Sequence, residues 1–431
     1  MRLLHVNATS HRGGAARAMR RLHNALTERG HESRFLVGRS MHPEDPLVYS
    51  IWDVVEGFTT PANRIKSRIG NQLERLIGSH PWANQNNLRI VDTDLYHWAD
   101  IIDLRNLFGG FFNLWCLPAL TAGKPVVWRM PDLWAVTGHC AYPYDCDRWV
   151  TGCHHCPLLR KDGRERVEPT PTLLDGSRRV WRGKKDIYQR SNLHIIVTTS
   201  WMRDQVERSI LGNALSVNII SNGVDLETYR PHPQEQVRLE LGLDPNEVIV
   251  LWAAGGKGNY RKGYHLAYGA LERIQAETGQ APWLITMGGE EGWSRPETLK
   301  KVKHFGYIRD ADMQARIYSA ADAFLCTTLA DGQPQTALES LACGTPVVAF
   351  DIGPMPGIAL EGKTGVIVTN PTAEALANTI EQHLIQGDGL SNLRESCRAF
   401  AESNFDLKVQ TGKYVSLYER ILQEHGGMGE V

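Results

Sequence analysis

The chain has 431 residues, of which 42% are hydrophobic and 22% charged, and its formal net charge is −1. This length exceeds a single ordinary core and suits two domains of about 200 residues each. The balanced charge argues against nucleic acid as a partner, and no apolar run approaches the ~20 residues that span a bilayer. Because the apolar start, residues 1–6, is also too short for a signal peptide, we expect a cytoplasmic protein.

Short apolar runs alternate with helical patterns along the chain. A first strand is expected at 3–6, a helix at 15–28 and a second strand at 33–37. Further strands are expected at 101–104, 126–128, 195–197, 217–220, 248–251, 284–286, 305–308, 323–326 and 347–349. Strands that alternate with helices of this length predict an α/β fold with parallel sheets and right-handed crossovers.

A domain boundary is expected where Gly and Asn interrupt the pattern at 221–225, because a fresh strand–loop–helix series begins after Pro245. We therefore predict two doubly wound domains, 1–221 and 222–398, followed by a final segment, 399–431. An apolar stripe indicates that this segment packs on another part of the protein. The residues of the stripe are Phe405, Tyr414, Leu417 and Ile421.

Two glycine-containing loops follow predicted strands and open helices. Gly13 and Gly14 would let the backbone approach a phosphate at a helix N-terminus, although a tight turn explains the same pair. The basic loop, residues 255–263, brings three cations to the end of a later strand: Lys257, Arg261 and Lys262. These cations suit a diphosphate, because they would neutralise its charge in the bound substrate and the charge that grows on it as it leaves. A solvated basic loop is the alternative.

Two carboxylates, Asp331 and Glu339, stand eight positions apart. Asp331 follows the apolar run 323–329, and Glu339 lies about one turn into the next helical pattern. Ligands of parallel sheets bind at the carboxyl ends of strands, so both acids suit a polyhydroxylated ligand such as a sugar nucleotide. Glu339 would accept from ribose hydroxyls and Asp331 from hexose hydroxyls; a helix N-terminal acid and a turn residue are the alternatives.

The order of these motifs resembles the GT-B glycosyltransferases of family 4. The matching segments are Gly13-Gly14, Ser200-Trp201, Asn222-Gly-Val-Asp225, the basic loop, and an acid followed after seven residues by Glu339 and then Ala342-Cys-Gly-Thr-Pro-Val-Val348. The resemblance implies two Rossmann-like domains facing a cleft, with a C-terminal helix that crosses back to the first domain. It also implies that a hexose moves from a UDP- or GDP-sugar to a glycan or lipid-linked acceptor, with retention of configuration and no catalytic metal.

The resemblance also assigns roles by position. Lys257 and Lys262 would hold the diphosphate with help from Arg261, Glu339 would bind the ribose, and Asp331 would face the hexose. The candidate catalytic residues are Asp331, Lys262 and Lys257, and the candidate donor-binding residues are Gly13, Gly14, Lys257, Arg261, Lys262, Thr336 and Glu339.

The chain departs from the family pattern at two positions. Asp331 stands where Glu is usual, and Pro131 stands where a His usually contacts the transferring sugar. His139 is a candidate substitute, or it simply packs its loop. These departures motivate a second hypothesis, a relative that binds sugar nucleotide without transferring the sugar. A sugar-nucleotide epimerase is a third hypothesis, for which the chain offers no clear set of acids and His.

Four cysteines lie within residues 139–157, in a Pro- and Tyr-containing stretch that ends in Cys-x-x-Cys: Cys140, Cys146, Cys153 and Cys156. In a reducing compartment, four thiolates suit a closed tetrahedral structural zinc site. Two disulfides or packed free thiols are the alternatives. The pattern also resembles a loop in a bacterial branch of family 4 that serves polysaccharide assembly, which implies a role for this chain in surface polysaccharide synthesis.

Residues 61–77 combine basic and apolar side chains at helical spacing. A basic amphipathic helix of this kind can lie on an anionic membrane surface. This predicts peripheral contact with the inner face of the cytoplasmic membrane, which would suit a lipid-linked acceptor. A surface helix packed on its own domain explains the same pattern.

Overall fold

The computed structural model describes residues 1–427 except 12–13, 40–43, 56–68, 70–71, 73–84, 160–173, 255–259 and 290–297. These residues form two compact units. Unit 1 contains the chain up to Ser221 together with the residues from Lys408, and unit 2 runs from Asn222 to Leu407. The predicted segment 61–77 lies outside the described residues except for Ile69 and Gln72.

Unit 1 is built on a seven-stranded parallel sheet in the order β3-β2-β1-β4-β5-β6-β7. Its strands are β1 (Arg2–Thr9), β2 (Glu32–Arg39), β3 (Val48–Ser50), β4 (Ile101–Leu104), β5 (Val126–Arg129), β6 (Leu193–Val197) and β7 (Ser216–Ile219). Its α-helices are α1 (Gly14–Thr27), α2 (Ile51–Val54), α4 (Asp94–Trp98), α5 (Leu117–Gly123), α6 (Ser177–Gln189), α7 (Ser200–Glu207) and α14 (Leu407–Gly427). Short 3-10 turns cover Gln85–Asp92, Leu114–Cys116 and Pro157–Leu159.

Unit 2 repeats the same topology in a six-stranded parallel sheet, ordered β10-β9-β8-β11-β12-β13. Its strands are β8 (Ile249–Ala253), β9 (Trp283–Met287), β10 (Val302–His304), β11 (Ala323–Cys326), β12 (Val347–Phe350) and β13 (Gly365–Val368). Its α-helices are α8 (Gln234–Glu240), α9 (Tyr264–Thr278), α10 (Ala311–Ala320), α11 (Gln335–Ala342), α12 (Ala373–Ile380) and α13 (Arg394–Phe405). Shorter turns lie at Tyr260–Lys262, Met355–Gly357, Glu381–Ile385 and Ser391–Leu393.

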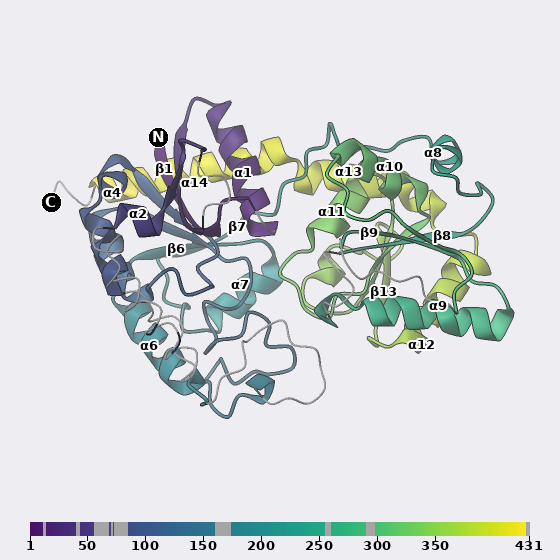
Figure 1. Ribbon diagram of the computed structural model, residues 1–431, viewed down its shortest axis with the longest axis horizontal. Coiled ribbons are helices and arrows are strands. Elements are labelled where there is room, and N and C mark those ends of the chain that lie inside the picture. Colours follow the sequence, from purple (N-terminus) through teal and green to yellow (C-terminus); the bar gives the residue numbers. More distant parts are fainter. Residues whose placement is uncertain are drawn as a thin grey trace. The chain divides into compact units, whose positions relative to one another are not determined.

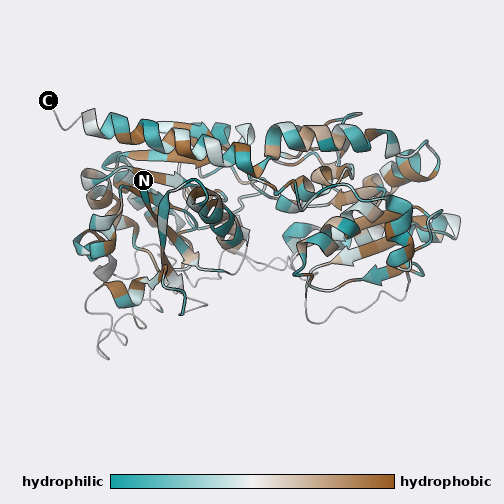
Figure 2. Ribbon diagram, turned by 90° about the horizontal axis from the view of Figure 1, so that it is seen from above, coloured by the Kyte–Doolittle hydropathy of each residue, from teal (hydrophilic) through white to brown (hydrophobic). Residues whose placement is uncertain are grey.

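Helices cover both faces of each sheet. In unit 2, α9 and α12 pack together on one face, and α10, α11 and α13 pack on the other (Figure 1). In unit 1, successive strand residues point to opposite faces, so Leu3 and Ile101 meet α1 and α14 while Leu4 and Ile102 belong to the core on the other side. Figure 2 shows this burial as hydrophobic residues concentrated along the strands. Both sheets are therefore the doubly wound parallel sheets that the alternating pattern predicts.

One predicted strand is displaced. The strand expected at 305–308 lies instead at Val302–His304, and the residues after it are irregular. Gly306 has a φ of +70° and its carbonyl accepts from the Gly288 N–H. The apolar residues Phe305 and Ile308 thus belong to a loop that packs against the core rather than to the strand.

The predicted apolar stripe of the last segment divides between the units. Phe405 packs in the core of unit 2. Tyr414, Leu417 and Ile421 of α14 pack with Leu3 in unit 1. The chain therefore returns to unit 1 through α14, whose hydrophobic and polar residues alternate along its length in Figure 2.

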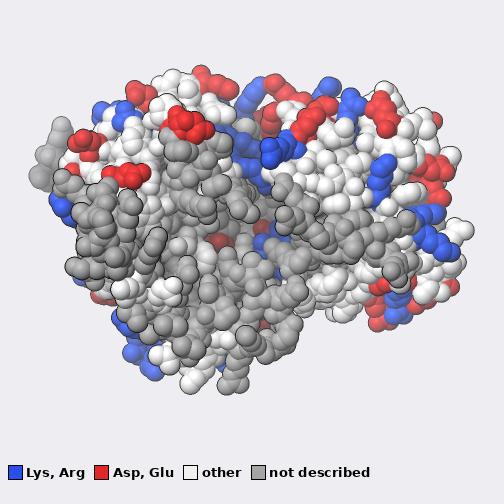
Figure 3. Space-filling model, in the orientation of Figure 1, with Lys and Arg blue, Asp and Glu red and all other residues white. Residues whose placement is uncertain are grey.

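The surface carries both charge signs. In Figure 3, acidic and basic side chains are interspersed over the described part of the face it presents, in keeping with the net charge of −1. Among the described residues, no helix combines the length and the apolar character needed to cross a bilayer.

A buried ionic cluster lies in the sheet of unit 1. Asp103 accepts from Arg105 Nε at 2.8 Å and Nη2 at 2.6 Å, and its Oδ2 lies 2.6 Å from His5 Nδ1. Burial by itself raises the pKa of the Asp103 carboxyl, but Arg105 and His5 outweigh it and hold that pKa below its usual value. Arg105 also lies over the ring of Tyr414, 5.3 Å from its centroid, so this cluster contacts α14.

Replacing Asp103 should therefore destabilise unit 1. We expect Asp103→Asn to cost about 3–5 kcal/mol, because the variant leaves the Arg105 charge buried without its carboxylate. Thermal and denaturant unfolding would measure the loss. The control is Asp100→Asn: Asp100 pairs with Arg2 at 2.7 Å just before the same strand, but at the surface, where we expect a far smaller effect. Equal stability losses in the two variants would contradict this role for the buried cluster.

Candidate active site

Three of the predicted site residues, Arg261, Lys262 and Asp331, lie together at the carboxyl ends of β8 and β11. In a doubly wound sheet, ligands bind at the point where the strand order reverses, because the helices that follow the two central strands lie on opposite faces there. In unit 2 this point lies between β8 and β11, which are hydrogen-bonded neighbours. The basic loop leaves β8 and the Asp331 loop leaves β11. Two segments 70 residues apart in the chain are thereby brought to one edge of the sheet.

Asp331 and two cations form an ion cluster at this edge. Lys262 Nζ donates to Asp331 Oδ2 at 2.6 Å, and Arg261 Nη1 donates to the same oxygen at 3.0 Å. The Asp331 side chain is 12% exposed, Arg261 14% and Lys262 24%. Burial alone raises the pKa of the Asp331 carboxyl, but the two cations outweigh it and lower that pKa below its usual value. The three charges are assembled and the carboxylate is ionised at neutral pH.

Backbone contacts between the two loops hold this cluster in place. Leu329 N–H donates to the carbonyl of Arg261 at 2.7 Å, and Arg261 Nη1 also donates to the carbonyl of Ala330 at 2.6 Å. Thr327 Oγ1 lies 3.0 Å from the Lys262 carbonyl oxygen and 2.9 Å from that of Gly263. The loop after β11 therefore fixes the backbone that carries both cations.

Gly263 makes this close approach possible. Its φ is +68°, and a Cβ built on it would lie 1.9 Å from the carbonyl oxygen of Thr327. The residue also precedes the first turn of α9 as its N-cap. Only glycine fits such a conformation next to a neighbouring carbonyl.

Glu339 and Thr336 lie on α11, the helix that follows the Asp331 loop. Glu339 is 6% exposed, and Tyr318 donates its hydroxyl to Glu339 Oε2 at 3.3 Å. Burial, and then the Glu339 charge, raise the pKa of Tyr318 well above its usual value, which keeps this hydroxyl a donor. Thr336 lies on the first turn of α11 and is partly exposed. The predicted geometry, one acid in a loop and one in the helix, is what the structure has.

Other predicted site residues are not in this cluster. Gly14 begins α1 in unit 1 and is exposed. Gly13 and Lys257 lie outside the described residues. Pro131 and Asp132 directly follow β5, whereas His139 is 7% exposed and lines a cavity among the cysteines.

Two glutamines connect the Asp331 loop to the first residues of unit 2. Gln333 Oε1 accepts from the Asn222 N–H at 2.8 Å, and Gln335 Nε2 donates to the Gly223 carbonyl at 3.2 Å. Gly223 in turn leaves no space for a side chain against Leu407. The motif Asn222–Asp225 is visible in the sequence, but its contact with Gln333 is not, because Asn222 and Gln333 are separated by 111 positions.

The four cysteines of 139–157 line one cavity of about 10 Å³. All eight cysteines of the chain are free thiols, so the disulfide alternative does not describe this structure. Within the described residues, no three His, Cys, Asp or Glu side chains are already disposed as ligands of one metal ion.

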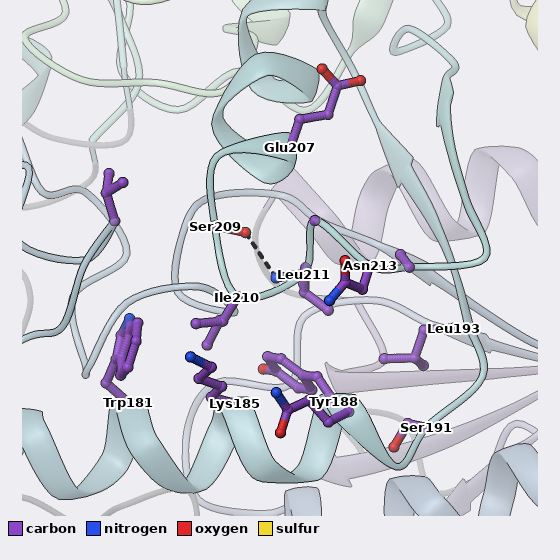
Figure 4. Close-up of a pocket in the computed structure, with 14 residues that line it drawn as sticks. Trp181, Lys185, Tyr188, Ser191, Leu193, Glu207, Ser209, Ile210, Leu211 and Asn213 are labelled. Atoms are coloured by element: carbon purple, nitrogen blue, oxygen red, sulfur yellow. Dashed lines mark hydrogen bonds between the residues drawn. The ribbon is translucent and has the colours of Figure 1, made fainter.

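A larger pocket of about 300 Å³ lies elsewhere in unit 1. Figure 4 shows Trp181, Lys185 and Tyr188 projecting from α6 toward the loop at Ser209–Asn213, where Ser209 Oγ accepts from Leu211 N at 3.0 Å. Leu193, the first residue of β6, also lines this pocket. The pocket therefore lies at the amino ends of the strands, opposite the edge at which parallel α/β sheets bind ligands.

Comparisons with known proteins relate this chain to glycosyltransferases. Residues 235–403, within unit 2, match the family model described as Glycosyl transferases group 1. D-inositol 3-phosphate glycosyltransferase of Gordonia bronchialis is 29% identical over 221 residues, which are 48% of this chain and 48% of that protein. The chain thus spans about half the length of this curated relative. The putative colanic acid biosynthesis glycosyl transferase WcaC of Escherichia coli is 24% identical over 363 residues, 81% of this chain and 83% of that protein.

Solved structures resemble the whole chain. HepE of Anabaena, crystallised in complex with UDP-glucose, is 16% identical and superposes with a TM-score of 0.64 over 97% of this chain and 100% of that chain. This likeness confirms the predicted fold class, GT-B with two Rossmann-like domains.

Gly263 provides a test of how the site is positioned. We expect Gly263→Ala to destabilise unit 2 strongly, because its Cβ would displace Thr327 and with it the cluster. The matched control is Gly279→Ala at the other end of α9: Gly279 has a φ of +77° but no atom within 4 Å of its Cβ position. That variant should cost only the left-handed backbone strain, about 1–2 kcal/mol. Thermal and denaturant unfolding would compare the two variants, and equal losses of stability would refute the positioning role.

Proposed function

We propose that the protein is a retaining glycosyltransferase that moves a hexose from a UDP- or GDP-sugar to a glycan or lipid-linked acceptor. The observation that carries the proposal is the ion cluster of Lys262, Arg261 and Asp331 at the strand-order reversal of unit 2, with Glu339 on the adjoining helix. Two cations at such a position suit a diphosphate, and a buried carboxylate beside them suits sugar hydroxyls.

The proposed reaction needs few protein groups. The bond between the anomeric carbon and the diphosphate oxygen breaks, and the acceptor oxygen bonds to that carbon on the same face. The acceptor proton passes to the departing diphosphate. Lys262 and Arg261 stabilise the charge that grows on the leaving group, so this chain supplies electrostatic stabilisation rather than a nucleophile. We propose that these groups act without a catalytic metal ion.

Donor binding must rearrange the ion cluster. Lys262 and Arg261 both bind Asp331 in the structure, so a diphosphate competes with that carboxylate for the two cations. We infer that Asp331 then turns to a hexose hydroxyl, while Glu339 accepts from the ribose. Charged hydrogen bonds of this kind contribute roughly 1.5–3 kcal/mol each.

The relatives support this class of reaction and suggest its setting. WcaC is named for colanic acid biosynthesis, a glycosyltransferase role in polysaccharide assembly, and HepE was crystallised with UDP-glucose. We propose that this chain likewise serves the assembly of a surface polysaccharide at the cytoplasmic side of the membrane. Residues 61–77 would supply peripheral contact with that membrane.

Release of free nucleotide from a panel of UDP- and GDP-sugars, in the presence of glycan and lipid-linked acceptors, tests the activity. Product analysis by NMR would give the anomeric configuration, and retention is expected. Inversion would refute the retaining mechanism, and the absence of donor-dependent release with every acceptor would refute the transferase.

A second candidate function is a relative that binds sugar nucleotide without transfer. The observation that favours it is the pairing of both cations with Asp331, together with Pro131 after β5. Tight donor binding by calorimetry, with no turnover when acceptor is supplied, would identify this function.

Glu339 should contribute to nucleotide affinity. We expect Glu339→Ala to weaken UDP binding by about 2–3 kcal/mol, since it removes a charged hydrogen-bond acceptor from the ribose. Calorimetric titration measures this loss. Glu395→Ala is the control, because Glu395 is exposed in the first turn of α13 and should leave binding unchanged. An unaltered dissociation constant in the Glu339 variant would remove this residue from the site.

A further inference from the structure

Four thiols of unit 1 surround a single small space. Cys140, Cys146, Cys153 and Cys156 line a cavity of about 10 Å³, although they are spread over 17 residues of irregular chain. Cys140 and Cys153 are buried, and the other two are partly buried. A space of this size holds one water molecule or one ion and no organic ligand.

One backbone amide is directed at the sulfur of Cys153. The Gly138 N–H donates to Cys153 Sγ at 3.1 Å. Gly138 is held against α6, because a Cβ built on it would lie 2.7 Å from the carbonyl oxygen of Ser177. Hydrogen bonds to a coordinating sulfur orient it and offset its charge, as the groups around metal ligands generally do.

His139 supplies an independent observation. It lines the same cavity and is 7% exposed, and its Nε2 is buried with no hydrogen-bond partner among the described residues. A buried polar nitrogen without a partner is costly. A thiolate in the cavity would accept a hydrogen bond from a protonated Nε2 and so remove this cost.

Lys184 supplies a second independent observation. Its side chain is fully buried on α6, and its Nζ donates to two neutral acceptors, the carbonyls of Trp134 and Thr137. Burial lowers the pKa of this ammonium to about 7, whereas Cys153, Cys140 and Asp132 act in the opposite direction. Its Nζ also lies 4.0 Å from the centroid of the Trp134 ring. Negative charge on the nearby cysteine sulfurs would therefore stabilise the protonated form of Lys184.

We propose that Cys140, Cys146, Cys153 and Cys156 bind one zinc ion as a closed structural site. Sulfur donors alone favour zinc over the hard cations calcium and magnesium, and four protein ligands leave no position for water or substrate. Because no three of these side chains are disposed around one point among the described residues, the four sulfurs would have to move together to bind the ion. His139 would donate to a ligand sulfur rather than bind the metal.

The site would fix a particular loop. Residues 131–157 leave the carboxyl end of β5, and the Leu133 N–H donates to the carbonyl of Ala141 at 3.0 Å. This hydrogen bond joins the segment that carries Pro131 and Asp132 to the residue next to Cys140, the first of the four cysteines. Zinc would hold the shape of the carboxyl edge of unit 1 without entering the chemistry of unit 2.

Elemental analysis of the full chain, purified without a metal-affinity column and kept reduced, tests the site directly. One zinc per chain is expected, and Cys153→Ser and Cys156→Ser should each lose it. Cys116→Ser is the control, because Cys116 is also a free thiol in unit 1 but lies outside the cavity, and it should keep the metal. Iron in place of zinc, no metal in the unaltered chain, or equal loss from the control would overturn the proposal.

Cobalt substitution keeps the test informative if the cysteine variants fail to fold. Adding Co²⁺ to the zinc-depleted unaltered chain should produce sulfur-to-cobalt charge-transfer absorption that saturates at one equivalent and disappears when zinc is added. His139→Gln should retain this absorption. Loss of the absorption in that variant, or its absence in the unaltered chain, would refute the four-thiolate site.

Discussion

The contact between the loops after β8 and β11 is the constraint on which the candidate site depends. Lys262 and Asp331 belong to different crossovers, and only the pairing of β8 with β11 brings the ends of those crossovers together. Gly263 allows the two backbones to approach closely. The Leu329–Arg261 and Thr327–Lys262 hydrogen bonds then fix the backbone from which both cations project. The ion cluster is a consequence of backbone register rather than of flexible side chains meeting by chance.

Burial gives this cluster its chemical properties. An exposed Lys–Asp pair is screened by water and contributes little. With Asp331 12% exposed and two cations on one oxygen, the carboxylate stays ionised and the cations stay oriented. The same low exposure means that an entering anion meets an already desolvated pair of cations, which strengthens its attraction to them. In the proposed function, the donor diphosphate would therefore replace Asp331 as the partner of these cations.

Much of this arrangement could be predicted from the sequence, since local patterns carry it. The runs at 248–251 and 323–326 predict buried parallel strands, and a motif of Asp331 and Glu339 around a helix start predicts one acid in a loop and one on a helix. The pairing of Asp331 with Lys262 and Arg261 could not be predicted, because it depends on register between segments about 70 positions apart. The prediction of a strand at 305–308, in place of Val302–His304, is wrong for a different reason. Phe305 and Ile308 are apolar because they pack against the core from a loop, not because they belong to a strand.

The loop that carries Asp331 also contacts the first residues of unit 2. The Leu329 N–H of this loop donates to the carbonyl of Arg261 in the basic loop. Gln333 accepts from the Asn222 N–H, and Gln335 donates to the Gly223 carbonyl. Val224, next in the chain, forms a β-bridge with Asp406, just before the chain passes back to unit 1 at Lys408. Both passages of the chain between the units thus meet beside the loop that carries Asp331. A rearrangement of that loop that displaced Gln333 would break its hydrogen bond to the Asn222 N–H, so the loop that carries Asp331 and the start of unit 2 are held together by the same contact.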